Sequence, residues 1–445
     1  LPPILITEPG DRYYGVLQDP FGLEVLRTGT VRANPNRFFS HLALTTWFEQ
    51  VPFILPLRSP IDRLYGTAAL ARIGIQLLLL YLLARLVSNR KRIRDHNFLL
   101  AALLILPLFQ TFGFNRQMGL LDMSITYCFF YALPLGVLLL FLQPFLSSTM
   151  HGEALRFSRI KAGLWILLIP VIALSGPLLP GIVAVLLLLF FGIPLLSTKS
   201  LPGAWQKWSL RPIELLLAIL LGIATLYSLY LGTFNLENPD QSVPGLGQRY
   251  LQLPEGLWKL WSNKLGLPLL SFLLLINTLI IRRQFKGPNG RHIRSIIRYA
   301  MLFALLYCLL LPLGGYRDYR ADIIRYDTFL PVTIALLLSY ALSAFFLLKQ
   351  HFFVGKNGYR LLLALSLLVF TAADQKQDRH YRCERSALEI LSRSTEPVVK
   401  LQQSCPILRW NSVERPEDSE RVGRLLYFWE ITDEPKRFYQ ERPSQ

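Results

Sequence analysis

Residues 314–328, with the sequence GGYRDYRADIIRYDT, place three arginines, three aspartates and three tyrosines in one short interval of a largely apolar chain. An arginine guanidinium is a planar fork that binds a phosphate through two parallel hydrogen bonds. Several arginines beside a bilayer are therefore suited to hold a lipid-linked phosphate or diphosphate, with tyrosines lining the lipid or a sugar. The candidates for such a phosphate clamp are Arg317, Arg320, Arg325, Tyr316 and Tyr319.

The same interval also fits a purely structural role. Tyr316, Tyr319, Ile323 and Tyr326 recur at intervals that would align them along one side of a helix, and the charged residues fall beside them. Such a helix would lie at the membrane interface, with tyrosines among the headgroups and charges paired with one another. The spacing leaves both interpretations open.

A phosphate clamp becomes a catalytic site only beside a general base. The segment TEPGDRYYG, residues 7–15, offers Asp11 for that role. Its carboxylate would take the proton of an acceptor hydroxyl while the phosphate of the donor leaves on the arginines. A separation of roughly 5–12 Å between this carboxylate and the nearest clamp guanidinium would leave room for a sugar phosphate. The alternative is an ordinary loop aspartate paired with Arg12.

Three further residues are candidates for contacts with the same substrate. Arg72 lies inside an apolar stretch, where an unpaired charge is costly, so it either extends outward or faces a cavity near the phosphate. Asp122 would add a second carboxylate, or it caps a helix. His41 would orient an acceptor hydroxyl, or it is a packed core residue.

Long apolar stretches must position these residues. Hydrophobic residues make up 52% of the chain and charged residues only 17%, which indicates an all-α polytopic membrane protein. A span needs about 20 apolar residues, and Gly176, Pro177 and Pro180 predict a tight hairpin between two of the candidates. We expect ten spans, at 66–87, 98–113, 122–146, 163–174, 178–196, 213–232, 267–281, 299–313, 329–348 and 360–373.

Charge assigns the two sides of this bundle. The loops 88–96, 147–162, 197–212, 282–298 and 349–360 together contain 19 basic and two acidic residues, whereas the segments on the other side each sum to zero. Cytoplasmic loops carry such a basic excess. Topology thus accounts for nearly all of the net charge of +18, and nucleic acid is excluded as a partner.

This alternation predicts three parts: an extracytoplasmic segment 1–65 with membrane-surface helices, a transmembrane bundle 66–373, and an extracytoplasmic domain 374–445. The first residues, LPPILIT, read as the end of a further span before Leu1, which would make about eleven. For the last part we expect a small α/β domain that leans on the bundle or on residues 1–65, with a helix at 384–393 and strands in PVVKL and RLLYFWEI. Cys383 and Cys405 in this part form a disulfide or remain two reduced thiols.

The layout resembles the GT-C superfamily of integral-membrane glycosyltransferases, which combine an acidic residue in a long first external loop with a multi-span bundle and an external C-terminal domain. The resemblance implies that Asp11 is the base or orients the acceptor. It implies a sugar donor linked to polyprenyl phosphate, for which Arg317, Arg320 and Arg325 are the candidate ligands. The absence of any N-x-[ST] sequon favours a bacterial envelope, so we expect the acceptor on the outer side of the bacterial inner membrane. The first loop has no Asp-x-Asp pair, and Glu8 and Asp19 are its nearest other acids, so no motif indicates whether a divalent metal takes part.

Two other classes of function fit the same sequence. One is a transporter or flippase of a lipid-linked or anionic substrate, which would need polar residues near the middle of the spans. The other is a non-catalytic membrane subunit whose C-terminal domain binds an envelope protein. In all three cases membrane lipids are partners of the chain.

Overall fold

A computed structural model describes residues 14–109, 120–155, 157–198, 211–236, 244–314, 322–373, 378–403 and 405–440. Seven of the helices within these ranges are long and apolar enough to cross a bilayer. They are α4 (Pro60–Ser88), the continuous unit of α6 (Ile125–Tyr127), η3 (Cys128–Ala132) and α7 (Leu133–His151), α9 (Leu178–Thr198), α11 (Pro212–Gly232), α13 (Gly266–Gln284), α14 with η4 (Pro288–Leu310, Leu311–Leu313) and α15 (Leu330–Lys349). The chain is a polytopic helical membrane protein.

The other three expected spans are helices too short to be counted with these seven. They are α5 (His96–Ile105), followed by the 3₁₀ turn η1 (Leu106–Leu108), then α8 (Arg159–Ala173) and α16 (Lys356–Ala372). Each falls short of the about 20 residues that a full crossing needs. The expected hairpin is present, since α8 and α9 are separated by a turn in which Gly176 has a φ of 117°.

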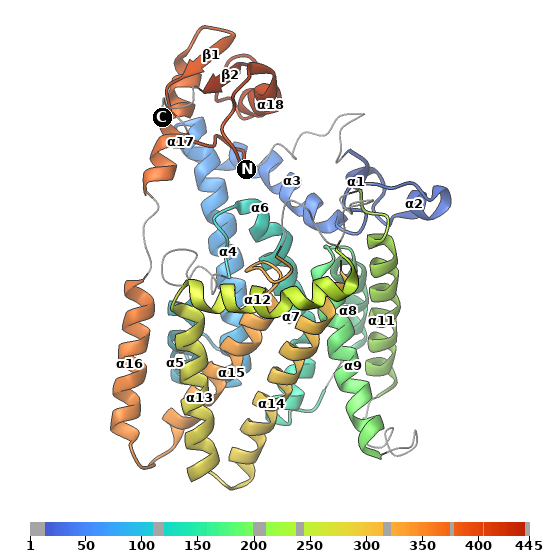
Figure 1. Cartoon of the computed structure of the whole chain (residues 1–445), viewed down its shortest axis with the longest axis vertical. Coiled ribbons are helices and arrows are strands. Elements are labelled where there is room, and N and C mark those ends of the chain that lie inside the picture. The colour runs from blue at the N-terminus through green and yellow to red at the C-terminus, as the bar shows by residue number, and fades with distance from the viewer. Residues whose placement is uncertain are drawn as a thin grey trace.

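The bundle is arranged around α15. In its most apolar window 72% of the residues are buried, against 28% for α9, α11 and α14, so α15 forms the centre and these three face outward. α15 packs on α13, α14, α5 and α4 (Figure 1). The outward faces of α13 and α14 are apolar, with Phe272, Leu275 and Leu305 exposed. These residues belong to the surface that a bilayer would cover.

Both polar ends of the chain gather at the same end of the bundle. Figure 1 shows α1 (Tyr14–Gln18), α2 (Leu23–Thr28) and α3 (Phe38–Ile54) beside the C-terminal region at the top, with the turns between α13 and α14 and between α15 and α16 at the bottom. α12 (Leu246–Asn263) runs across the bundle instead of along it (Figure 1). We call the C-terminal region, residues 378–440, the cap.

The cap is a small mixed structure. It consists of α17 (Asp378–Arg393), β1 (Val398–Leu401), η5 (Pro416–Ser419), α18 (Glu420–Phe428) and β2 (Arg437–Gln440). β1 and β2 are parallel and pair Val398 with Arg437. The helix expected at 384–393 and the strand in PVVKL are confirmed, as is the disulfide between Cys383 and Cys405.

The expectation of a strand in RLLYFWEI is wrong. Most of this segment belongs to α18, and the second strand follows it at Arg437–Gln440. Val422, Leu425, Leu426 and Trp429 are buried, and their spacing of three and four residues places them on one side of a helix. Helical periodicity therefore prevails over the strand preference of Tyr, Phe and Trp.

The cap leans on α3 and the start of α4, as expected. Arg63 forms an ion pair with Glu430 at 2.6 Å, and Asp62 forms one with Arg385 at 2.8 Å. The indole of Trp429 donates a hydrogen bond to the carbonyl oxygen of Phe48 at 2.9 Å. These contacts tie elements from opposite ends of the sequence together.

Candidate functional site

Three of the candidate residues that the structure describes, Arg72, Asp122 and His41, converge on η3, the single turn of π-helix between α6 and α7. A π-helical turn hydrogen-bonds over five residues instead of four, and such turns occur frequently at functional sites. Of its five residues, Cys128, Phe129, Phe130 and Ala132 are buried. α3 and α4 both pack against this turn, so side chains from the first external segment and the first span meet there.

Arg72 reaches η3 from α4. Its guanidinium donates to the hydroxyl of Tyr381 in the cap at 3.0 Å and, through a second nitrogen, to the carbonyl oxygen of Met123. It also contacts the thiol of Cys128. The Nε of Arg72 is buried and has no hydrogen-bond partner, and within the described ranges no carboxylate forms an ion pair with this side chain. The guanidinium of Arg72 thus lies between Tyr381 of the cap and Met123 of the bundle.

Asp122 belongs to the same group. Its carboxylate accepts a hydrogen bond from the backbone N–H of Ser124 at 2.8 Å, and its carbonyl oxygen accepts one from the thiol of Cys128 at 3.3 Å. The first contact closes a turn just before α6, whose N-cap residue is Ser124 with no side-chain cap, so Asp122 does not cap this helix. Asp122 and Arg72 therefore both lie against Cys128.

Arg37, the residue just before α3, and His41 in its first turn both reach η3. The Arg37 guanidinium lies over the ring of Phe130, 4.9 Å from its centroid, and 5.8 Å from that of Tyr131. The Nε of Arg37 is buried without a hydrogen-bond partner. The His41 ring lies 4.7 Å from that of Phe130, and burial together with the charge of Arg37 lowers the pKa of His41 to about 3. His41 is therefore a neutral imidazole at physiological pH.

The loop before α3 fixes Arg37 in place. The side-chain amide of Asn36 donates to the carbonyl oxygen of Ser228 at 3.0 Å, and the carbonyl oxygen of Asn36 accepts from the N–H of Gly176 at 2.9 Å. Ser40 donates to the carbonyl oxygen of Ser175 at 2.8 Å. A Cβ at Gly176 would lie 2.9 Å from the Nε of Arg37, so glycine is required there for the guanidinium to pass as well as for the positive φ.

Sequence reasoning missed Arg37. It stands among six basic residues that balance six acidic ones in residues 1–65, and it lies outside every apolar stretch, so neither charge nor hydropathy distinguishes it. Two buried asparagines, Asn34 and Asn36, precede it. Polar side chains of this kind often form loop hydrogen bonds, and they were the available signal that this segment is fixed against the bundle.

Arg325 is occupied within its own loop. Its Nε donates to the carboxylate of Asp327 at 3.1 Å and another nitrogen donates to the carbonyl oxygen of Asp322 at 2.9 Å. The side chain of Asp327 is only 4% exposed, so this is a largely enclosed ion pair. Residues 322–328 form turns, so the interpretation of the interval as one interfacial helix does not hold for this part of it. The hydroxyl of Thr328 closes these turns by accepting from the N–H of Arg325 and donating to the carbonyl oxygen of Ile323.

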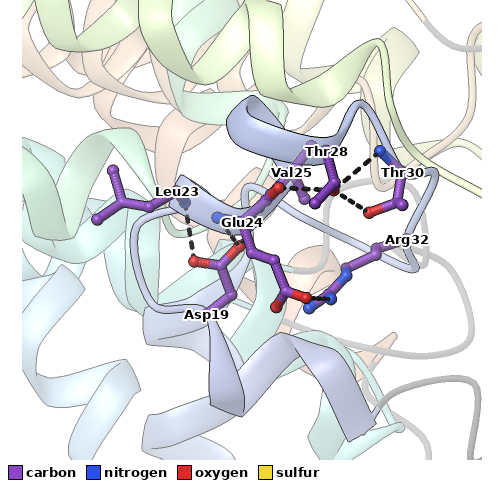
Figure 2. A network of polar contacts seen from close by, with 7 residues as sticks. All are labelled: Asp19, Leu23, Glu24, Val25, Thr28, Thr30 and Arg32. Carbon is purple, nitrogen blue, oxygen red and sulfur yellow. Dashed lines mark hydrogen bonds and ion pairs between the residues drawn. The ribbon is translucent and has the colours of Figure 1, made fainter.

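Asp19 was named above as an acid near Asp11, and it lies within the described residues. Its role is structural and local. Figure 2 shows its carboxylate at the start of α2, where it accepts hydrogen bonds from the N–H groups of Leu23 at 2.8 Å and Glu24 at 3.0 Å. Glu24 in turn forms an ion pair with Arg32 at 2.6 Å (Figure 2). Because its oxygens cap this helix, Asp19 is a poor candidate for the general base.

A second polar group lies inside the bundle, between α13, α15 and α16. The amide of Asn277 donates to the hydroxyl of Ser343 at 2.9 Å, and the side chain of Tyr359 lies beside Asn277. Tyr340 neighbours Tyr359, and the oxygen atoms of Asn277, Tyr340 and Tyr359 side chains are buried without hydrogen-bond partners. All four residues belong to helices that cross or approach the membrane, and a hydropathy pattern does not single them out.

The expected site residues thus fall into three sets. Arg72, Asp122 and His41 are brought together around η3, with Arg37 as an additional member, whereas Arg325 is engaged with Asp327. The third set, Asp11, Tyr316, Arg317, Tyr319 and Arg320, lies outside the residues that the structure describes. In the described ranges no three His, Cys, Asp or Glu side chains gather in a way that would hold a metal ion.

The chemistry of the η3 group is that of an anion site. Two guanidinium groups with buried Nε atoms that have no hydrogen-bond partner flank one π-helical turn, and the neutral imidazole of His41 contacts Phe130 as Arg37 does. Charge-assisted hydrogen bonds from guanidinium to phosphate or carboxylate are among the strongest polar contacts in proteins. Comparison of the chain with protein-family models, curated proteins and solved structures finds no match in any of the three. A functional assignment therefore depends on these residues themselves.

Proposed function

We propose that this protein is an integral-membrane glycosyltransferase of the cell envelope, which takes a sugar from a polyprenyl-phosphate-linked donor at the capped end of the bundle. One observation carries the proposal: Arg37 and Arg72 lie against η3 with no carboxylate paired to either in the described ranges. An uncompensated charge inside a membrane protein is costly and marks a functional site. A phosphate between the two guanidinium groups would offset that cost.

We further propose that the capped end faces away from the cytoplasm. The loops with the basic excess connect the helix ends opposite the cap, and such loops stay cytoplasmic (Figure 1). The disulfide between Cys383 and Cys405 suits an oxidising compartment on the capped side. Both arguments favour a position of the cap and α1–α3 outside the cytoplasm, which is the periplasm if the protein belongs to a bacterial inner membrane, as we propose.

In this mechanism the protein separates charge stabilisation from proton transfer. The bond between the sugar's anomeric carbon and the phosphate oxygen breaks, and Arg37 and Arg72 stabilise the leaving phosphate. The acceptor hydroxyl attacks the same carbon and gives its proton to a carboxylate, for which Asp11 is our candidate. His41 is neutral and therefore suited to hold the acceptor hydroxyl by a hydrogen bond without adding charge. Arg317 and Arg320 remain candidates for further phosphate contacts.

The direct test is binding of the carrier lipid. A short-chain polyprenyl phosphate is titrated into the full-length protein in vesicles, and Arg37→Gln and Arg72→Gln are compared with Arg58→Gln, an exposed arginine in the linker between α3 and α4. Loss of one charged hydrogen-bond donor costs about 1.5–3 kcal/mol, so each of the first two variants should bind roughly 10–100-fold more weakly. Arg58→Gln should bind as the unaltered protein does. Equal binding by all four proteins would refute the phosphate site.

Sugar transfer distinguishes the enzyme from its alternatives. Membranes that contain the protein are supplied with a polyprenyl-phosphate sugar carrying a labelled sugar, and the label is followed into envelope glycan, lipid and protein. Transfer that Asp11→Asn abolishes while phosphate binding persists would support the glycosyltransferase. Binding without transfer would replace it with a flippase or transporter, for which the buried group around Asn277 supplies polar residues inside the bundle. No binding at all would favour a non-catalytic subunit with the cap as its partner surface.

A further inference from the structure

α12 has three chemically distinct sides. Leu253, Gly256 and Leu260 are buried, and a Cβ on Gly256 would lie 3.1 Å from the Cβ of Ile324, so this side packs tightly on residues 322–328. At about 100° per residue these three positions fall on one third of the helix surface. The remaining two thirds are free of the bundle and differ sharply from each other.

The second side is apolar and exposed. Leu251 is 78% exposed, Trp258 65% and Trp261 43%, and the two indoles stack with their ring centroids 6.0 Å apart. On the helical projection these residues lie next to one another and adjoin the buried side. Aromatic side chains of this size remain exposed in a soluble environment only at a cost of a few kcal/mol.

The third side is charged. Lys259 lies within 2.9 Å of Glu255 and 3.1 Å of Asp322, and all three side chains are half exposed or more. The hydrogen bonds that Lys259 donates to Glu255 and Asp322 raise the pKa of Lys259, so its ammonium stays charged at physiological pH. Ion pairs that are this exposed need contact with water.

The ends of α12 join the lipid-facing surface of the spans. Near its start, Tyr250 donates to the carbonyl oxygen of Leu309 at 3.0 Å and Arg249 to that of Pro312 at 3.1 Å, which fixes the helix to the end of α14. Its last residues lead directly into α13. Leu313 and Leu265, at these two junctions, are 58% and 57% exposed, so the apolar side of α12 continues the outward faces of both spans.

We propose that α12 is an interfacial helix that lies in the plane of the membrane. Leu251, Trp258 and Trp261 enter the boundary between headgroups and acyl chains on the capped side, Lys259 with its partners faces water, and Leu253 with its neighbours faces the protein. A helix at the edge of a bundle has these three environments at this depth, and tryptophan prefers this zone. The course of α12 across the bundle in Figure 1 agrees with this placement.

The occupant of the apolar side is lipid, because that side is continuous with spans that already face lipid. α12 also packs on the loop 322–328, which contains the ion pair of Arg325 and Asp327. Gly256 contacts Ile324 of this loop, and Lys259 forms an ion pair with Asp322. A membrane-bound α12 would therefore hold this loop at the membrane surface. This inference does not depend on the proposed glycosyltransferase. It assigns a lipid-binding surface whichever reaction the protein performs.

Tryptophan fluorescence tests the assignment. The chain has eight tryptophans, so the emission of interest is the difference between the unaltered protein and a Trp258→Phe/Trp261→Phe variant, both in phosphatidylcholine vesicles. We expect this difference to be quenched more by lipid brominated near the headgroup end of the chain than by lipid brominated near the chain terminus. Iodide in the water should quench it weakly. The matched control is Trp410→Phe, since Trp410 lies in the cap and is 53% exposed.

For Trp410 the expected pattern is the reverse, with strong quenching by iodide and none by brominated lipid. Emission from Trp258 and Trp261 that follows the Trp410 pattern would overturn the proposal, because the helix would then lie in water. Protection from both quenchers would also overturn it and would indicate a protein partner on this side. Leu251→Trp in the double Phe variant provides an independent probe, and the same lipid-dependent quenching is expected at that position.

Discussion

His41 makes the stability of this protein dependent on pH in a predictable direction. The pKa of His41 is about 3 in the folded protein and 6.5 in its unperturbed state. His41 is therefore protonated below about pH 6.5 in the unfolded chain, but only below about pH 3 in the folded protein. By linkage, the contribution of His41 to stability is complete above pH 6.5 and falls by about 1.4 kcal/mol for each pH unit below it.

Between about pH 7.5 and about pH 5 this loss amounts to about 2 kcal/mol. The imidazole is 3% exposed, so solvent screening does little to reduce the figure. Unfolding of 445 residues at about 2.1 cal/mol/K per residue gives a fall in Tm of about 2 °C. The shift is larger if helices persist in the unfolded state, because the entropy of unfolding is then smaller.

The measurement is a thermal scan of the purified protein in detergent, followed by intrinsic tryptophan fluorescence at both pH values. His41→Gln keeps a polar side chain of similar length without a titrating group, and it should lose about 2 °C of the difference in Tm between the two pH values. His96→Gln is the matched control, since His96 is exposed at the start of α5 and its replacement should leave the pH dependence intact. An unchanged pH dependence in His41→Gln would show that His41 is not the buried neutral imidazole described here.

Two further predictions concern stability. Replacing both Cys383 and Cys405 with serine opens a loop with a sequence separation of 22 residues, so the cap should lose about 3 kcal/mol of stability, seen as faster proteolysis within residues 378–440 while the bundle stays resistant. Asn277→Leu removes the buried hydrogen bond to Ser343 and should cost about 0.6–1.7 kcal/mol in a denaturation series, with Thr278→Leu, whose hydroxyl bonds only within its own helix, as the comparison. Equal effects of the two leucine variants would argue against a stabilising contact between α13 and α15.

Spans were predictable because the bilayer imposes a length and a composition on them. The stretch 178–196 and the helix Leu178–Thr198 nearly coincide, as do 329–348 and Leu330–Lys349. The stretch 66–87 was too short at its start, where α4 begins at Pro60. Asp62 and Arg63 lower the hydropathy of that first turn, although Pro60 at the first helical position and the acidic Asp62 suit a helix start, and both charges pair with the cap. Contacts between residues so distant in sequence are invisible to a local pattern.

Amphipathic elements were the ones that local reasoning mistook. No apolar stretch marks α12, because its leucines and tryptophans alternate with charged and polar residues and never form an apolar run. The helical spacing in 322–328 was equally misleading. There the carboxylate of Asp327 accepts a hydrogen bond from the N–H of Thr328. The hydroxyl of Thr328 accepts one from the N–H of Arg325. These side-chain contacts close turns where a helix would need backbone bonds.

The charge balance of the capped end conceals how the charges are used. Residues 1–65 contain six basic and six acidic residues, and a sum of zero suggests that every charge has a counterpart nearby. In the described ranges several acids are engaged elsewhere, as Asp19 caps α2 and Asp62 pairs with the cap. Among the described residues Arg37 contacts the rings of Phe130 and Tyr131 and forms no ion pair, and Arg72 contacts a hydroxyl, a thiol and a carbonyl oxygen. Neutrality of the segment as a whole therefore coexists with a local positive excess at η3, which is the condition that binding of an anionic headgroup requires.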